Sequence, residues 1–324
     1  MPNLILTGRC SSACEYCFTN GALLGDLTLK TLAEIMPFVS TFRSRKLNIL
    51  GGEPSLNPEF IGILQYLLER KYELLVFTNG DIAPPVLTGL MGLTTARLEF
   101  VVNRSLEVLR ANTIKFYRSL GYRTKIGVTI FRANQSVQHL IGEIEEFRLR
   151  KAIRIGIALP SYPPFENVHP DPEAYPEISN EIFPFLVECI AKGIKPEFDC
   201  GFPHCFFTEE QRALLHEHSA EFVSNCGLIP DILPDRTLIP CFPLGNFKTI
   251  INGESSWINS RITLEGLIAG AKRKHLFEVC GSCRHLNSQQ CSMGCAAFAV
   301  HGGDRGSRVQ NDSGSLPSLE VSHS

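Results

Sequence analysis

Short aliphatic runs alternate with longer amphipathic stretches through the first half of the chain. Runs of β-branched residues and leucine recur at intervals of very roughly 25 residues and are bounded by polar residues, as buried strands are. They predict strands at 4–7, 47–50, 74–78, 98–102, 125–131 and 153–158. Between them, apolar residues at three- and four-residue steps predict helices at 28–42, 60–68, 105–120 and 136–150. Strands that alternate with helices favour a parallel sheet with right-handed crossovers, so we expect an α/β fold, an open or partial (β/α)6 barrel.

The pattern changes in the second half. A proline-rich loop at 160–176 leads into a predicted helix at about 176–192, and from Glu197 onward cysteine-bearing loops replace the regular alternation. We therefore place a boundary near residue 195, with the barrel at 1–195 and a small cysteine-rich domain at 196–301. The stretch 302–324 is rich in Ser and Gly and lacks apolar periodicity, which predicts a disordered tail.

Composition narrows the functional classes. A net charge of −2 gives no electrostatic reason to expect binding to nucleic acid or to an anionic membrane surface. No segment approaches the roughly 18 continuous apolar residues of a membrane span, and the first residues lack the features of a secretory signal. We expect a cytoplasmic protein.

Twelve cysteines in such a chain indicate metal binding, because the cytosol keeps thiols reduced. Cys189 stands alone in an apolar run and is expected to be a small buried hydrophobe. The others form one set near the start and one set beyond residue 199. They are Cys10, Cys14, Cys17, Cys200, Cys205, Cys226, Cys241, Cys280, Cys283, Cys291 and Cys295.

The first three cysteines directly follow the first predicted strand, at spacings of three and two intervening residues. Clustered thiolates select iron–sulfur clusters or zinc over hard cations. A cluster of four irons normally takes four cysteines, so this loop would leave one iron open to another ligand. A structural zinc knuckle is the alternative, although such sites usually draw four protein ligands.

With Tyr16 just before Cys17, and with Gly51-Gly52-Glu53-Pro54 after the second predicted strand, this pattern resembles the radical S-adenosylmethionine (SAM) superfamily. The resemblance implies a TIM-like partial barrel that binds a 4Fe–4S cluster and SAM. Reductive cleavage of SAM to a 5′-deoxyadenosyl radical, which abstracts a substrate hydrogen, is the implied reaction. Glycines allow close approach of backbone to a ligand, and Glu53 can accept hydrogen bonds from the ammonium group of SAM.

The resemblance also implies a cofactor pocket at the strand ends. Tyr16 would lie near the adenine, and polar residues after the third, fourth and fifth strands would line the pocket. Those residues are Asn79, Asn103, Ser105 and Arg132. Their alternative role is turn or helix-cap chemistry.

The later cysteines resemble the SPASM extension of radical SAM enzymes, which holds one or two auxiliary 4Fe–4S clusters. This chain departs from the SPASM pattern in lacking a cysteine after Cys295 and in placing seven residues, where five are usual, between Cys283 and Cys291. By resemblance, Cys226, Cys241 and Cys295 would share one cluster, and Cys280, Cys283 and Cys291 the other. How Cys200 and Cys205 divide between them stays open, as do a zinc ribbon at 280–295 and a single auxiliary cluster. His204, His285 and His301 are interpreted as ordinary loop histidines, and Trp257 as a packing residue.

The expected function is radical SAM modification of a ribosomally made peptide, by crosslinking or oxidation. A small metabolite is the alternative substrate, and a non-catalytic electron carrier is a third possibility that the Gly51–Pro54 turn argues against. The enzyme would need an external one-electron reductant of the flavodoxin or ferredoxin type. Because the first strand begins near residue 4, a separate protein would deliver a leader peptide. No residue stands out as a general base.

Overall fold

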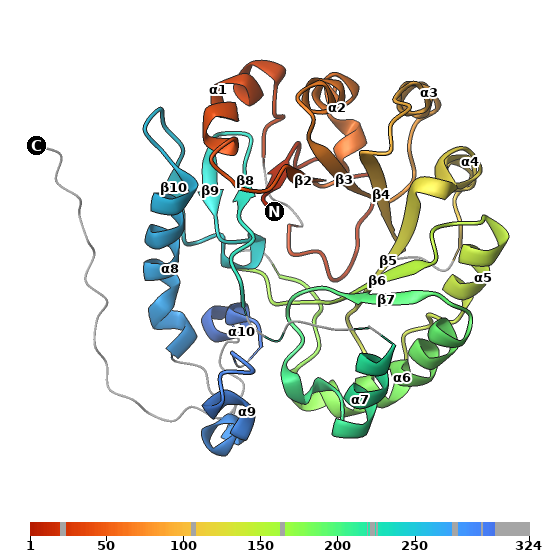
Figure 1. Cartoon of the computed structure of the whole chain (residues 1–324), viewed down its shortest axis with the longest axis vertical. Coiled ribbons are helices and arrows are strands. Elements are labelled where there is room, and N and C mark those ends of the chain that lie inside the picture. The colour runs from red at the N-terminus through yellow and green to blue at the C-terminus, as the bar shows by residue number, and fades with distance from the viewer. Residues whose placement is uncertain are drawn as a thin grey trace, which may run out of the picture.

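The computed structural model describes residues 1–19, 24–104, 108–162, 166–218, 220, 224, 226–273, 278–292 and 294–301. The predicted tail at 302–324 lies outside these residues. One sheet organises the described chain, in the strand order β10-β9-β8-β1-β2-β3-β4-β5-β6-β7. β1 to β7 are parallel neighbours in chain order, β8 pairs in parallel with β1, and β9 and β10 follow in antiparallel pairs. Figure 1 shows this sheet curving round an interior like an open barrel, with α1 to α6 outside it.

The strands are β1 Asn3–Ile5, β2 Lys46–Leu50, β3 Glu73–Thr78, β4 Leu98–Asn103, β5 Thr124–Ile130, β6 Ala152–Ile157, β7 Lys195–Phe198, β8 Asp231–Ile232, β9 Thr237–Ile239 and β10 Thr249–Ile250. The helices are α1 Leu29–Val39, α2 Phe60–Glu69, α3 Pro84–Gly92, α4 Ala111–Leu120, α5 His139–Glu146, α6 Tyr175–Ala191, α7 Glu209–Glu217, α8 Trp257–Arg273, α9 Arg284–Asn287 and α10 Ala296–His301.

The α/β expectation with a parallel sheet is confirmed, and the six predicted strands agree with β1 to β6 to within two residues at each end. Several helices are shorter than their apolar patterns indicated: α4 begins at Ala111 and α5 at His139. Thr28 starts α1 as expected, because its side chain accepts a hydrogen bond from the backbone N–H of Thr31.

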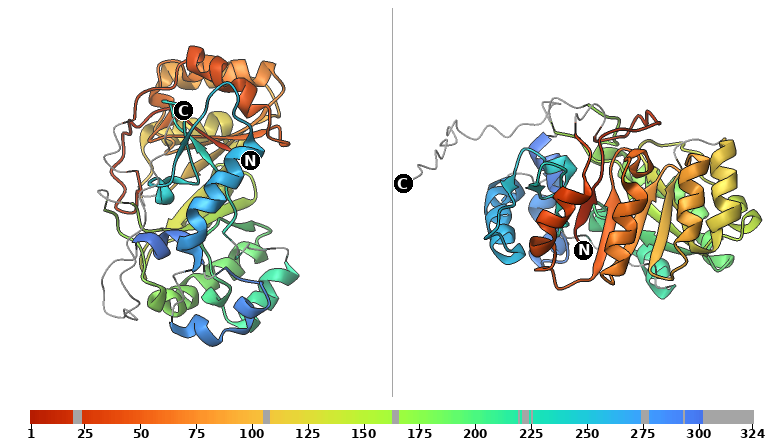
Figure 2. Two further views of the ribbon diagram at one scale, coloured as in Figure 1. Left: turned by 90° about the vertical axis from the view of Figure 1, so that its left-hand side faces the viewer. Right: turned by 90° about the horizontal axis from the view of Figure 1, so that it is seen from above.

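The region beyond residue 195 holds more regular structure than the sequence indicated. β7 begins at Lys195 itself and pairs with β6, so the sheet continues past the proposed boundary. α8 is 17 residues long, contacts α10, and lies at the same side of the molecule as β8–β10, at the left in Figure 1 and in the right-hand view of Figure 2. Its first residue, Trp257, stacks on Phe42 at 4.7 Å between ring centroids, which confirms the packing role expected of it.

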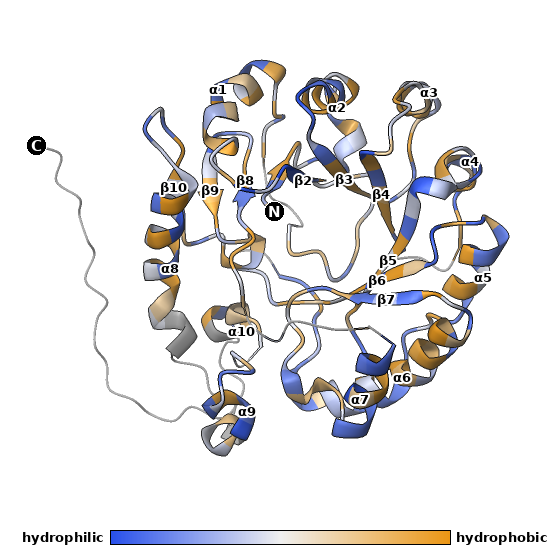
Figure 3. Ribbon diagram, in the orientation of Figure 1, coloured by the Kyte–Doolittle hydropathy of each residue, from blue (hydrophilic) through white to orange (hydrophobic). Residues whose placement is uncertain are grey.

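The core lies between the sheet and its helices, where strand residues such as Ile49, Val76 and Phe100 are fully buried. Figure 3 shows hydrophobic positions on the strands and on the helix faces turned toward them. The barrel interior is more polar: Arg154 on β6 pairs with Asp199 at 2.6 Å, and Lys125 on β5 pairs with Glu197 on β7. Among the described helices, none is long and apolar enough to cross a membrane.

Candidate functional site

The first cysteine loop leaves the carboxyl end of β1, at the edge of the sheet where parallel α/β folds place their active sites. Its backbone turns tightly, because the N–H of Cys17 donates to the carbonyl of Cys14 at 3.0 Å. Burial raises the pKa of the Cys10 thiol, and the negative charges of Glu53, Cys14 and Cys17 raise it further. The fold thus keeps the three thiols in one small site.

The two glycines of the Gly51-Gly52 turn lie directly against the segment that leads into this loop. The N–H of Gly52 donates to the carbonyl of Thr7 at 2.9 Å, and that of Glu53 donates to the carbonyl of Arg9 at 2.7 Å. A Cβ on Gly52 would lie 2.3 Å from the Arg9 carbonyl oxygen, and one on Gly51 would lie 2.7 Å from that of Thr7. Only glycine therefore fits at either position without moving the cysteine loop.

Glu53 is fully buried, and its carboxylate is held by the end of β3. It accepts hydrogen bonds from the hydroxyl of Thr78 at 2.9 Å, from the N–H of Asn79 at 2.7 Å and from the N–H of Ser55 at 3.1 Å. Burial raises its pKa while these donors lower it. The side chain thus fixes the turn to β3, a role that the sequence did not reveal.

The other predicted pocket residues lie at neighbouring strand ends. The Asn79 amide donates to the hydroxyls of Ser11 at 3.0 Å and Ser12 at 3.2 Å, so it supports the cysteine loop. Asn103 extends over Gly127, where a Cβ would lie 2.5 Å from its amide oxygen. Ser105 lies outside the described residues.

Tyr16 and Arg132 meet at the end of β5. The Tyr16 ring lies 5.1 Å from that of Phe131, and the Arg132 guanidinium is 3.9 Å from the carboxylate of Glu15. Both members of this ion pair are more than half exposed, so it holds the loop only weakly.

Asn167, in the proline-rich loop, is a site residue that the sequence analysis missed. Its amide group donates to the carbonyls of Tyr16 and Leu159, each at 2.9 Å, and its oxygen accepts from the N–H of Ser161 at 3.1 Å. The next residue, Val168, donates its N–H to the carbonyl of Glu15 at 2.8 Å. The loop after β6 is therefore hydrogen-bonded to the first cysteine loop. No motif in the sequence predicts this contact, because the two segments lie about 150 residues apart.

Four later thiols form a first cysteine group, made of Cys200, Cys226, Cys241 and Cys295. Burial raises the pKa of Cys200 well above its usual range, and the charges of Asp199, Cys295 and Cys226 raise it further. The pKa of Cys241 is raised in the same way, by burial and then by the charges of Cys295, Asp231, Cys200 and Cys226. These thiols thus lie near enough for their charges to act on one another, although they come from four separate segments.

The remaining four thiols form a second cysteine group, made of Cys205, Cys280, Cys283 and Cys291. Burial raises the pKa of Cys205, and the charges of Cys291 and Cys283 raise it further. Cys280 shares a turn with Cys283, whose N–H donates to its carbonyl at 3.1 Å. The charges that act on Cys205 thus come from other thiols than those that act on Cys200, a difference that the sequence did not reveal.

Thiolate sulfur is the donor that iron–sulfur clusters require, and each group offers four. Within the described ranges, no three Cys, His, Asp or Glu side chains converge closely enough to hold a single metal ion. Cys189 belongs to neither group: it is fully buried, as expected, and burial raises its pKa to about 12.

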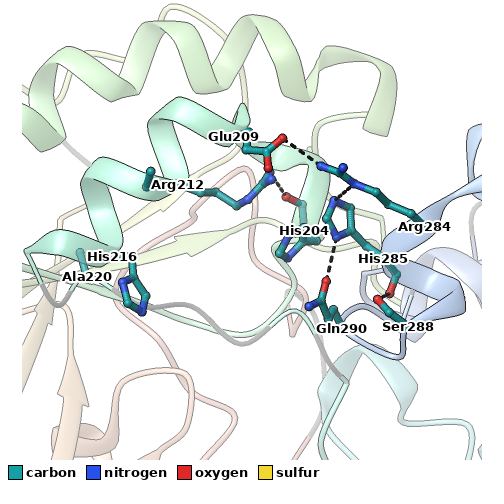
Figure 4. Close-up of a pocket in the computed structure, with 10 residues that line it drawn as sticks. His204, Glu209, Arg212, His216, Ala220, Arg284, His285, Ser288 and Gln290 are labelled. Carbon is teal, nitrogen blue, oxygen red and sulfur yellow. Dashed lines mark hydrogen bonds and ion pairs between the residues drawn. The ribbon is translucent and has the colours of Figure 1, made fainter.

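A hollow of about 830 Å³ lies beside the second group, between α7 and α9. His204 and His285 face each other there, with ring centroids 3.9 Å apart, and Arg212 and Arg284 stand near them (Figure 4). Burial and the charge of Arg212 lower the pKa of His204 to about 4, so this imidazole is neutral at pH 7.

Comparison with known protein families finds a match in the part of the chain that contains the first cysteine loop and the Gly51–Pro54 turn. Residues 4–100 match the model of the radical SAM superfamily. This match agrees with the resemblance carried by the first cysteine loop and the Gly51–Pro54 turn.

Curated relatives match over a quarter to two fifths of this chain. An S-adenosylmethionine-dependent nucleotide dehydratase from Selenomonas ruminantium is 35% identical over 81 residues, which are 25% of this chain and 30% of the relative. A probable GTP 3′,8-cyclase from Methanothermobacter marburgensis is 26% identical over 128 residues, which are 38% of this chain and 41% of the relative. The chain thus spans less than half the length of these relatives.

Solved structures match over much more of the chain. Streptococcus suis SuiB bound to S-adenosylmethionine has a TM-score of 0.61 at 17% identity, covering 91% of this chain and 73% of SuiB. anSMEcpe with bound AdoMet has a TM-score of 0.62 at 16% identity, covering 91% of this chain and 88% of the other. At this level of identity, the likeness describes a shared fold.

Proposed function

We propose that the chain is a radical SAM enzyme whose first cysteine loop, Cys10, Cys14 and Cys17, holds three irons of a 4Fe–4S cluster. The observation that carries the proposal is the Gly51-Gly52 turn pressed against the segment before Cys10. When bound, the cluster and SAM supply one-electron cleavage of a carbon–sulfur bond and hydrogen abstraction by the 5′-deoxyadenosyl radical. An electron carrier would not need this turn.

The chain's own residues orient the reactants. Glu53 fixes the turn to β3, so the backbone carbonyls of Gly51 and Gly52, in place of its buried side chain, would accept the ammonium group of SAM. Tyr16 would lie near the adenine, Asn103 would contact the ribose, and Arg132 would extend the pocket at the end of β5. Positioning of this kind is what the protein contributes to cofactor chemistry.

Each later cysteine group would hold an auxiliary 4Fe–4S cluster. The first would use Cys200, Cys226, Cys241 and Cys295, and the second Cys205, Cys280, Cys283 and Cys291. Cys205 would then replace the cysteine that the SPASM pattern has after Cys295. This assignment leaves both auxiliary sites fully ligated by protein, whereas the first loop keeps one iron open.

We propose a ribosomally made peptide as substrate, modified by crosslinking or oxidation. In support, a fold neighbour, SuiB, is bound to the precursor peptide SuiA, and another, anSMEcpe, to the peptide Cp18Cys. A flavodoxin or ferredoxin would supply the electron, and a separate protein could present the peptide. The alternative, a small metabolite, is supported by curated relatives whose names specify nucleotide chemistry.

The test is anaerobic reconstitution of the full chain with iron and sulfide, followed by SAM and dithionite. Formation of 5′-deoxyadenosine supports the proposed enzyme, and about twelve irons per chain supports three clusters, against about four for the first loop alone. If the reconstituted protein forms no 5′-deoxyadenosine, it is not a radical SAM enzyme. A mass change in a short peptide encoded beside the gene would decide between peptide and metabolite.

A further inference from the structure

The chain enters and leaves the first cysteine loop, residues 7–26, at neighbouring points. Leu6 precedes the loop and Leu27 follows it, and the N–H of Leu27 donates to the carbonyl of Leu6 at 2.8 Å. Both side chains are fully buried in the core between the sheet and its helices. The fold therefore closes the base of the loop that carries the three thiols.

One buried side chain joins the two ends of this loop. Asn57 follows the Gly51–Pro54 turn and is only 3% exposed. Its amide nitrogen donates to the carbonyl of Leu6 at 2.7 Å and to that of Leu27 at 2.9 Å, while its oxygen accepts the N–H of Glu59 at 2.7 Å. Both hydrogens of the amide are thus used. A carboxylate of the same shape could not donate to the two carbonyls.

Arg9 also joins the loop to the segment before Asn57. Its guanidinium donates to the carbonyl of Leu56 at 2.6 Å and pairs with Asp26 at 2.7 Å. The Arg9 side chain is more than half exposed, so its ion pair contributes little. Asn57 is buried, and its removal would take the donor from a buried carbonyl, which costs more. Asn57 is therefore the stronger of these two links.

A closed base matters at this site because the first loop would hold its cluster by three thiolates only. Closing a flexible loop costs conformational entropy, and metal binding must supply that free energy where the fold has not closed the loop beforehand. Ligands that are already held together bind with a smaller entropic cost. Each later cysteine group offers four thiolates and depends less on one such support.

We propose that Asn57 is a positioning residue for the first cluster: it joins the two ends of the cysteine loop before iron binds and so sets how firmly the three thiolates retain the cluster. This inference rests on the proposed function, because it requires a cluster at the first loop. Asn57 acts through the backbone of the loop, and the same hydrogen bonds hold the loop in the cluster-free chain.

The first experiment measures hydrogen exchange in the cluster-free full chain. The amide of Leu27 should exchange about tenfold faster in Asn57→Ala than in the wild type, because two hydrogen bonds at the base of the loop are lost. Asn57→Asp is made as well, since it keeps the shape of the side chain and removes only the donors. Unchanged exchange of Leu27 in both variants would show that Asn57 does not close the loop.

The matched control is Asn48→Ala. Asn48 is another buried amide, 5% exposed on β2, and it donates to the side chain of Asn3 at 2.8 Å. Its removal should lower overall stability without opening the base of the cysteine loop, so the exchange of Leu27 should stay as in the wild type.

The second experiment follows iron release to EDTA from the anaerobically reconstituted chain. Electron paramagnetic resonance identifies the first cluster as the one whose signal changes when SAM is added. We expect both Asn57 variants to lose this cluster about tenfold faster than the wild type and to retain the auxiliary clusters equally well. A role in overall stability alone would speed release from every cluster.

Three results would overturn the inference. Wild-type iron release in both Asn57 variants would exclude the role of Asn57 and leave the proposed function standing. Equally fast loss of the first cluster in Asn48→Ala would show that any missing buried amide has this effect. A wild type whose first loop takes up no cluster would remove the proposed function and this inference together, whereas the exchange of Leu27 would still report whether Asn57 closes the loop.

Discussion

The two cysteine-bearing regions of the molecule are built in opposite ways. The first loop places three thiols within eight residues and is held by hydrogen bonds from the turn after β2, the end of β3 and the loop after β6. The two later groups collect their thiols from separate segments spread between residues 200 and 295. The fold prepares the first site in advance, whereas metal binding would itself help to order the second region.

The largest effect should come from the first loop. Replacing Cys17 by Ala removes one of only three protein ligands, so 5′-deoxyadenosine formation should fall below detection in a chromatographic assay. Cys189→Ala is the matched control, because it removes a buried thiol that belongs to no group, and it should retain cleavage. Wild-type cleavage in Cys17→Ala would refute the proposed ligand set.

The next effect should come from the backbone contact that positions this loop. In Gly52→Ala, the new Cβ would meet the Arg9 carbonyl at 2.3 Å, so the loop must move. Misplacement of this kind should slow SAM cleavage on the order of 100-fold. Gly142→Ala is the control: its Cβ meets nothing within 4 Å, and alanine in α5 should stabilise the protein by up to about 1 kcal/mol. Equal cleavage in the two variants would show that the contact is unimportant.

The later groups should behave differently, because the proposed function assigns SAM cleavage to the first loop. Cys283→Ala and Cys205→Ala should each lose the cluster of the second group, keep some uncoupled 5′-deoxyadenosine formation and lose product. Cys200→Ala should instead lose the first group's cluster. Spectra in which Cys200→Ala and Cys205→Ala lose the same cluster would disprove this division, and full product formation in Cys283→Ala would disprove the auxiliary role itself.

The last effect is on stability and its pH dependence, with cleavage unaffected, and it concerns the junction between the two regions. Asp231 opens β8 beside β1, and its carboxylate accepts the side-chain amide of Asn3 at 2.6 Å. Burial raises its pKa from 3.8 to about 7, so the folded state holds a proton that the unfolded state releases. The free energy of unfolding should therefore fall as the pH rises from about 4 to 7.

Asp231→Asn should remove this part of the pH dependence. Relative to the variant, the wild type should lose up to roughly 4 kcal/mol across that window, measured by denaturant unfolding at several pH values. Parallel curves for the two proteins would mean that Asp231 titrates normally.

The sequence predicted the barrel strands well because each contains an apolar run whose alternate residues are buried, as in β3 and β5. It missed β8 and β10, which have two residues each and carry no periodicity. The first cysteine loop was visible because its residues are adjacent in the chain. The support from Asn167 and the different thiol neighbours of Cys200 and Cys205 were not, because both depend on long-range packing.

The hydrogen bonds from Asn167 and Val168 to the carbonyls of residues 16 and 15 limit how the substrate specificity of this protein can be redesigned. The loop after β6 contacts the first cysteine loop, so it is a place where a grafted segment with different substrate contacts could be tried. A graft that discards Asn167 would also remove the hydrogen bond that holds residue 16, between Cys14 and Cys17, to the loop after β6. Specificity swaps in this loop should therefore keep both anchoring positions and vary only the residues between them and β6.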